Sequence, residues 1–311
     1  MNKKIFFSDK KNIDLIKELA KKNGNILNRS SLISIVAYLN ENNLVSGLYV
    51  SYLKNKLIDM HLFEEIKILH KDNVIRRLVP TYIKISPNEI ALSLAGKKAH
   101  LSHLSALSIN QLTNIIPKNI YVNEEQTKKN INKKNAILTQ NKVNNAFLKP
   151  VRKTNNTAIF SYQSKKYLVT FLNGKNTNYV GVENIIRDGY SKPVRVSGIE
   201  RSLMESIIRP NYSGGLENVM DAFENGKSIP VSLNKLSALF IKSEYIYPYL
   251  NAVLFFAKET GYNTDILKSK MNADYYKYNA ENIILPLDHQ LINPQIDNIA
   301  KVYYPKKLIN E

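Results

Sequence analysis

The clearest structural pattern in this chain of 311 residues is the stretch Ser197-Gly-Ile-Glu-Arg-Ser-Leu-Met-Glu-Ser-Ile-Ile-Arg-Pro-Asn-Tyr-Ser-Gly-Gly-Leu-Glu-Asn-Val-Met-Asp-Ala-Phe223. Apolar residues repeat in it at helical spacing, first at Leu203, Met204, Ile207 and Ile208 and then at Leu216, Val219, Met220 and Phe223. Pro210 ends the first helix because proline lacks an N–H and clashes with the preceding turn. Ser213-Gly-Gly215 supplies the open backbone of a corner. Two short amphipathic helices are not stable alone, so the C-terminal half is expected to be built around this pair.

Length and composition predict two globular domains in a cytoplasmic protein. A chain of 311 residues is long enough for two cores, and 44% apolar residues is an ordinary value. The absence of cysteine excludes disulfides, thiolate metal sites and cysteine nucleophiles. The basic N-terminus lacks an apolar core of signal-peptide length, and no apolar run reaches the roughly 18 residues of a membrane span. We therefore expect no membrane partner.

The positive charge is concentrated in the middle of the chain. Residues 91–180 carry 14 Lys and Arg but only 2 Asp and Glu, whereas residues 181–311 carry 15 of each. Residues 1–90 carry 15 against 9. Codon bias in an AT-rich genome explains abundant Lys, Asn and Ile, but not the near-absence of acidic residues in the middle alone. The asymmetry predicts that the first half binds a polyanion.

Residues 1–88 have the element order of a winged helix-turn-helix. Helices are expected at Asn12–Lys22, from the cap-rich Asn28-Arg-Ser-Ser31 onward, and at Leu48–Met60. Two β-branched segments follow, Phe63–Leu69 and Val74–Val79, and form a hairpin signal. The third helix of such a domain enters the DNA major groove, and the hairpin is the wing.

The third helix and the wing supply the candidate DNA contacts. Leu48, Tyr52, Leu53 and Leu57 mark the inner side of the helix, and polar residues mark its outer side. Basic residues of the wing are expected to contact phosphates, from which most of the affinity and salt dependence arise. The candidate contacts are Arg29, Tyr49, Ser51, Tyr52, Lys54, Asn55, Lys56, His70, Lys71, Arg76 and Arg77. The alternative is a small α/β domain with a solvated basic face.

The middle of the chain is expected to contain helices at Pro87–Ala99 and His100–Ile109 and an extended segment at Asn119–Val122. The Lys/Asn-rich segment of about residues 127–156 is interpreted as a linker or a partly ordered arm. Strands are expected at Thr157–Tyr162 and Lys166–Leu172.

Several motifs in residues 90–125 and 190–262 together resemble a known family. They are His103-Leu-Ser-Ala-Leu107, Leu112-Thr113, Ile116-Pro-Lys118, Ile120-Tyr-Val122, Glu125-Gln126, Gly198-Ile-Glu-Arg-Ser-Leu203, Arg209-Pro210, Tyr212-Ser-Gly-Gly215 and Tyr247-Pro-Tyr249. In order and spacing they are similar to the AbiEi-type antitoxins, the DNA-binding regulators of AbiE (type IV) toxin–antitoxin systems. Residues 1–88 match that family in type rather than in motif.

The resemblance implies an α+β protein, with a winged helix-turn-helix followed by a mixed α/β antitoxin-type domain over residues 89–311. It implies an antitoxin that represses its own operon and counteracts a nucleotidyltransferase-like toxin, without requiring a stable complex with it. Two or more copies are expected on an operator with repeats. No cofactor, metal or catalytic residue is expected. The antitoxin-domain motif residues are Glu200, Arg201, Tyr212, Gly214, Gly215, Tyr247, Pro248 and Tyr249.

Charged residues of the opening stretch have three interpretations. Arg201 with Glu205 and Glu205 with Arg209 are spaced i,i+4 and predict surface ion pairs worth about 0.3–0.5 kcal/mol each. A recognition face for a charged partner is the functional interpretation. The family resemblance favours instead a buried structural role for Glu200 and Arg201.

Two other classes of function remain as alternatives. One is a stand-alone winged-helix transcription regulator whose C-terminal domain senses a ligand or dimerises. The other is a nuclease, which needs clustered carboxylates that the strands at Thr157–Leu172 lack. His100 and His103 are expected on one helical face as packed or hydrogen-bonded histidines rather than as metal ligands.

Overall fold

The computed structural model of this protein describes residues 2–128, 137–271 and 275–309. The described part has an α+β fold, as the sequence predicts, and divides into two compact units. Unit 1 comprises Met1–Lys97, Asn156–Val169 and Asn184–Val194, and unit 2 comprises Lys98–Asn155, Thr170–Glu183 and Arg195–Glu311. The boundary expected between residues 88 and 89 falls inside helix α5 (Pro87–Leu92), whereas the units part after Lys97.

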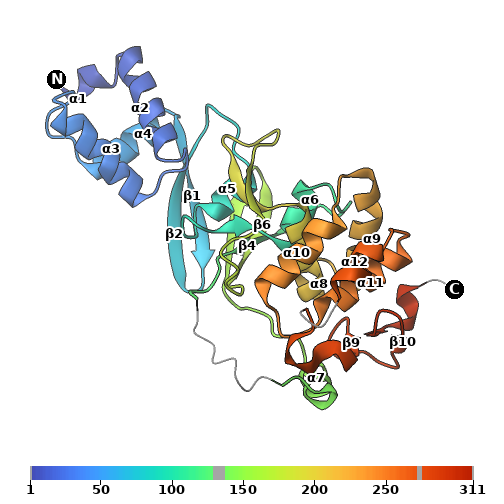
Figure 1. The fold of residues 1–311 in the computed structure, drawn as a ribbon. Helices are drawn as coiled ribbons and strands as arrows, with labels where there is room; N and C mark the ends of the chain where they lie inside the picture. The colour runs from blue at the N-terminus through green and yellow to red at the C-terminus, as the bar shows by residue number, and fades with distance from the viewer. Residues whose placement is uncertain (1, 129–136, 272–274, 310–311) are drawn as a thin grey trace. The chain divides into compact units, whose positions relative to one another are not determined.

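Four helices open unit 1 (Figure 1): α1 (Lys3–Phe6), α2 (Lys10–Lys22), α3 (Arg29–Glu41) and α4 (Val50–Asp59). Asn28 begins α3 as predicted, because its side chain accepts a hydrogen bond from the Ser31 N–H. Helix α1 lies outside the sequence prediction. The apolar faces of the four helices form a core that includes Phe6, Ile16, Leu19, Ile35, Leu39, Leu53 and Leu57.

The predicted hairpin is confirmed as β1 (Phe63–His70) and β2 (Asn73–Pro80), which are antiparallel and joined by a two-residue turn. β1 also pairs with β5 (Thr157–Tyr162), so β2 lies at the edge of the unit 1 sheet. A single β-bridge joins Leu27, in the segment that connects α2 and α3, to Leu78 of β2. The hairpin is therefore held beside its turn on one side, at Ile68–His70, and near its base on the other, at Leu78.

Helix α5 is shorter than predicted. A capping box of Ser86 and Glu89 begins it, but it ends at Leu92 instead of Ala99. Arg77 donates a hydrogen bond of 2.8 Å to the Ser93 carbonyl, which is the acceptor that a further helical turn requires. Glu89 also accepts hydrogen bonds from the N–H and hydroxyl of Ser191, and these hold residues 184–194 to unit 1.

The strands of unit 2 pair in two groups. β3 (His100–Leu101) pairs antiparallel with β4 (Asn119–Asn123) and parallel with β8 (Val194–Ser197). β10 (Gln295–Asp297) and β9 (Leu285–Pro286) flank β11 (Val302–Tyr304). β6 (Lys165–Leu172), β7 (Val182–Ile185) and β8 each have residues in both units.

The prediction of one helix over His100–Ile109 is wrong at its start. His100 and Leu101 belong to β3, and helix α6 covers His103–Ile109. The apolar spacing suits a helix, but backbone pairing with β4 and β8 determines the local conformation, because distant strands override a weak propensity.

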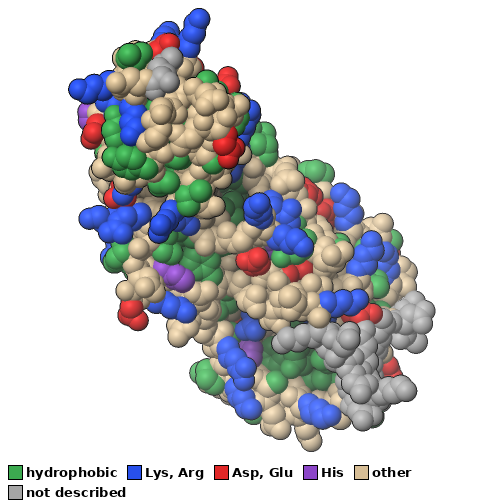
Figure 2. Space-filling model, turned by 90° about the vertical axis from the view of Figure 1, so that its left-hand side faces the viewer, with side chains coloured by type: hydrophobic (Ala, Val, Ile, Leu, Met, Phe, Trp, Pro, Cys, Tyr) green, Lys and Arg blue, Asp and Glu red, His purple; other side chains and the backbone are tan. Residues whose placement is uncertain are grey.

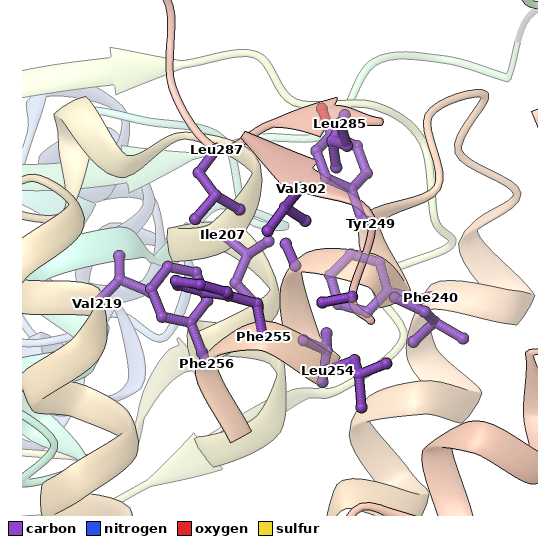
Figure 3. Packing of buried hydrophobic residues seen from close by; sticks show 14 of the residues in the cluster. Ile207, Val219, Phe240, Tyr249, Leu254, Phe255, Phe256, Leu285, Leu287 and Val302 are labelled. Atoms are coloured by element: carbon purple, nitrogen blue, oxygen red, sulfur yellow. The ribbon is translucent and has the colours of Figure 1, made fainter. Parts of the chain in front are cut away.

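The opening stretch folds as predicted into α8 (Ile199–Ile208), a corner, and α9 (Leu216–Asn225). Helices α10 (Leu233–Ser243), α11 (Tyr249–Glu259) and α12 (Asp265–Lys270) complete the helical part of unit 2. Figure 3 shows Ile207 of α8 and Val219 of α9 near Phe255 and Phe256 of α11, with Val302 of β11 beside them. The two helices thus bury their apolar stripes against the almost wholly buried α11.

The Lys/Asn-rich segment is not simply a linker. Residues 129–136 lie outside the described part of the chain, but Gln140–Phe147 forms helix α7. Val143 and Phe147 are buried in the core of unit 2.

In the described residues, none of the helices has the length and apolar character needed to cross a membrane.

The corner between α8 and α9 depends on Gly215. Its backbone has φ +93° and ψ 177°, a region that is almost restricted to glycine. A Cβ atom would cause no steric clash, because its nearest neighbour, a Glu217 carboxylate oxygen, would lie at the van der Waals distance of 3.4 Å. We therefore expect Gly215→Ala to lower the free energy of unfolding by about 1–3 kcal/mol through backbone strain alone. Urea denaturation measures this, and the exposed Asp221→Ala on α9 is the control. Equal stability of the two variants would contradict the strain.

Candidate functional site

The outer side of α4 in unit 1 is polar. Leu53 and Leu57 are completely buried, whereas Tyr49 is 54% exposed. Ser51 and Asn55 are also exposed and lie one turn apart on the same side of the helix. A helix with such a face can present hydrogen-bonding groups to base edges in a major groove.

The outer part of the β1–β2 hairpin exposes cations on the same face as apolar side chains. Lys67 and Arg76 are directly opposite each other in the register. Leu69 and Val74, the next opposite pair on this face, are 55% and 45% exposed. Lys71, in the turn, is exposed as well. Opposed like charges on a strand pair are unfavourable, so this face favours binding of an anion.

Lys67 and Lys3 are the cations that sequence reasoning missed. Lys67 follows from the hairpin register once the turn is placed at residues 71 and 72. The Lys3 Nζ lies 4.7 Å from the ring centre of Tyr49 and 5.3 Å from that of Tyr52, and the two rings are in edge contact. No sequence signal indicated that contact, because it joins the first helix to the fourth.

Two of the predicted DNA-contacting side chains, those of Arg77 and His70, form hydrogen bonds within unit 1 instead. Arg77 donates hydrogen bonds to the carbonyl and hydroxyl of Ser93, and burial lowers the pKa of its guanidinium. The His70 ring lies 2.8 Å from the Asn156 side-chain oxygen. Arg76 and Arg77, neighbours on a strand, therefore point to opposite faces, and only Arg76 points to the open one.

The remaining predicted contacts lie around α4. Arg29 is exposed at the first position of α3, and Lys56 is half-buried. Lys54 forms an ion pair with Glu65 of β1, whose carboxylate lies 3.8 Å from Arg76. This network links α4 to the hairpin. Figure 2 shows Lys and Arg side chains spread widely over the face that it presents.

In unit 2, Arg201 is the centre of a buried ionic cluster. Its guanidinium donates to Glu205 Oε1 at 2.9 Å, to Glu125 Oε1 at 2.8 Å and to the Val180 carbonyl at 2.6 Å. Arg201 is only 2% exposed, and the two glutamates are also buried. The expectation of a surface Arg201–Glu205 pair is therefore wrong, and the burial of Arg201 that the family resemblance favours is confirmed.

The cluster keeps its carboxylates ionised. Burial alone would raise the pKa of Glu125, but hydrogen bonds from Thr177, Tyr179 and Arg201 lower it. Burial opposes ionisation of Glu205 too, and the Arg201 charge lowers its pKa. The two glutamates in turn raise the pKa of Arg201 against the effect of burial.

The motif around Gly198 positions this cluster. The Gly198 N–H donates to the Gly181 carbonyl at 2.8 Å, and a Cβ atom on Gly198 would lie 3.1 Å from that oxygen and 2.5 Å from a Glu183 carboxylate oxygen. Glu200 is buried and accepts a hydrogen bond from the Ser232 N–H, at the start of α10. Gly198 and Arg201 thus attach α8 to residues 180–181, Arg201 also attaches it to Glu125, and Glu200 attaches it to the start of α10.

The other motif residues are also packed. Tyr212 contacts His103 and Tyr121, with ring centres 5.6 Å from each, and its hydroxyl accepts a hydrogen bond from the Thr154 N–H. Gly214 and Gly215 form the corner. Tyr247 and Tyr249 are 6.0 Å apart on either side of Pro248, and Tyr249 is buried.

His100 and His103, which the sequence places on one helical face, belong to different elements: His100 to β3 and His103 to α6. His100 is completely buried, with Nε2 3.5 Å from Glu205. His103 packs in the aromatic group of Tyr121 and Tyr212, and burial lowers its pKa to about 4. In the described part of the chain, no three His, Asp or Glu side chains are grouped as metal ligands.

Comparison with protein-family models and with curated proteins finds no match to this chain.

Proposed function

We propose that this protein is a DNA-binding antitoxin that represses its own operon through unit 1 and counteracts a nucleotidyltransferase-like toxin through unit 2. The observation that carries the DNA-binding part is the polar outer side of α4 beside the cationic face of the β1–β2 hairpin. The antitoxin part is supported by the resemblance of the unit 2 motifs to AbiEi-type antitoxins.

The geometry of unit 1 supports a winged helix-turn-helix. Helices α2, α3 and α4 precede the hairpin, and a single β-bridge between Leu27 and Leu78 joins the segment between α2 and α3 to β2. In such a domain α4 would lie in the major groove, with Tyr49, Ser51 and Asn55 toward base edges. Lys67, Lys71 and Arg76 would contact the phosphates.

The test of DNA binding is fluorescence anisotropy with the DNA upstream of the gene. We expect binding at low salt that weakens steeply as salt rises. Absence of binding at low salt would rule the proposal out. Asn55→Ala is expected to change the preferred sequence, because its amide is placed to read bases rather than phosphates.

Arg76→Gln is expected to weaken binding to all DNA sequences and to reduce the salt slope by about one, because one phosphate contact is lost. The control is Lys166→Gln, which removes another exposed charge near the start of β6. Equal effects of the two variants would show that only net charge matters. Arg77 is unsuitable as a probe because its guanidinium is used within unit 1.

Co-expression separates the antitoxin from a stand-alone regulator. A full-length Arg76→Gln protein with weakened operator binding is expected still to rescue growth from the toxin encoded beside it. Operator binding by the wild-type protein without any rescue would favour the stand-alone regulator.

A further inference from the structure

Unit 2 contains a large cleft that the proposed function does not use. Its volume is about 1280 Å³. The lining comes from residues 126–128, 146–147, 149–152, 175–178, 207–211, 242–247, 249, 252 and 285–289. All of these residues belong to unit 2. Pockets for single small molecules usually measure roughly 300–1,000 Å³, so this cleft has room for a larger ligand.

The cleft is lined by more cations than carboxylates. The cations are Lys128, Lys149, Arg152, Lys175, Arg209 and Lys242, and the carboxylates are Glu244 and Asp288. Among the described residues, no carboxylate lies within ion-pair distance of Lys149, Arg152, Arg209 or Lys242. The site therefore favours a ligand with several negative charges.

Arg209 is the most informative of these cations. The sequence predicts an ion pair with Glu205, but this pair is not formed. Pro210 disfavours helical geometry at the preceding residue, and Arg209 has φ −140° and ψ 70°. Its side chain therefore does not lie one helical turn above Glu205, which binds Arg201 and Ser197 instead. A half-buried guanidinium is thus left in the cleft wall without a partner in the described chain.

Aromatic rings line the same cleft. The ring of His289 stacks on Phe147 with centres 4.8 Å apart, and Tyr247 meets Phe147 edge-on at 5.5 Å. The Lys175 ammonium lies 4.6 Å from the centre of the Tyr245 ring. His289 and Tyr247 are half-exposed. Both polar atoms of the Asn211 amide are buried in the wall and find no hydrogen-bond partner in the described residues.

From this combination we infer that the cleft of unit 2 binds a short run of single-stranded nucleic acid. Cations along a groove hold the phosphates of such a ligand, and aromatic faces stack on its unpaired bases. Arg209 binds a phosphate, and Tyr247 with His289 forms the stacking surface. This site goes beyond the proposed function, because operator binding uses duplex DNA and unit 1.

The test measures binding of a fluorescein-labelled oligouridylate of eight residues to the full-length protein by anisotropy. Arg209→Gln and Tyr247→Leu are each expected to weaken this binding about tenfold, through loss of a phosphate contact and of base stacking. Lys235→Gln, which removes an exposed charge of α10 outside the cleft, is expected to leave it unchanged. Thermal melting verifies that each variant is folded.

Binding of operator duplex by the same variants separates the two sites. Arg209→Gln is expected to keep duplex affinity, and Arg76→Gln to keep oligouridylate affinity. If oligouridylate binding is insensitive to both cleft variants, the inference is overturned, whatever duplex DNA does. Inorganic tripolyphosphate that binds as tightly as oligouridylate at equal phosphate concentration would also overturn it, because stacking of bases would then contribute nothing to the affinity.

Discussion

Arg201→Ala is expected to lower the free energy of unfolding by about 3–5 kcal/mol. The substitution leaves the carboxylates of Glu125 and Glu205 buried without their common counter-ion. It also removes the donor to the Val180 carbonyl, which ties the loop before β7 to α8. Urea denaturation followed by circular dichroism measures the change.

Arg209→Ala is the matched control for this prediction. Arg209 follows the same helix, but no ion pair joins it to another described residue, so its replacement is expected to change stability by no more than about 0.5 kcal/mol. Glu205→Gln should resemble Arg201→Ala in direction, because it removes one charge from the same cluster. If both arginine variants are equally stable, the cluster does not have the role assigned to it.

Acidification is expected to destabilise unit 2 in two phases, of which His103 causes the first. Burial lowers the pKa of His103 to about 4 in the folded protein, against about 6.5 when unfolded. The folded state therefore binds fewer protons between these values, and stability falls as the pH decreases from about 6.5 to 4. At about 1.4 kcal/mol per pKa unit, the loss amounts to about 3 kcal/mol.

The carboxylates Glu125 and Glu205 cause the second phase. Their pKa values are lowered in the folded protein. Their contribution to stability is therefore fully present at pH values above the ordinary pKa of glutamate, and it is lost as the pH falls below that pKa. The two phases therefore follow each other as the protein is acidified.

His103→Asn isolates the first phase. Asparagine tolerates the left-handed backbone that His103 adopts at φ +49°. The variant should be less stable than the wild type at neutral pH, but its free energy of unfolding should hardly change between pH 6.5 and 4.5. His61→Asn is the control, because His61 has a similar φ of +53° but is exposed. A wild-type pH profile in the His103 variant would show that another group titrates.

Local elements of this protein follow from the sequence. Periodicity and caps located α2, α3, α8 and α9, because a helix is stabilised by residues a few positions apart. The β1–β2 hairpin can also be predicted, because its two strands are close in sequence and joined by a short turn. Its register places Lys67 beside Arg76. Pro210 also indicates that Arg209 leaves the helix, which places its side chain out of register with Glu205.

Only the tertiary structure decided which side chains meet. Glu125 and Arg201 are separated by 76 residues, and the hydrogen bond between them converts an expected surface pair into a buried cluster. Pairing with β4 and β8 makes His100 part of a strand, although its local pattern is helical. The cleft also comes from segments between residues 126 and 289. Burial and strand pairing depend on what the folded chain brings alongside a residue, and spacing along the sequence carries no information about that neighbour.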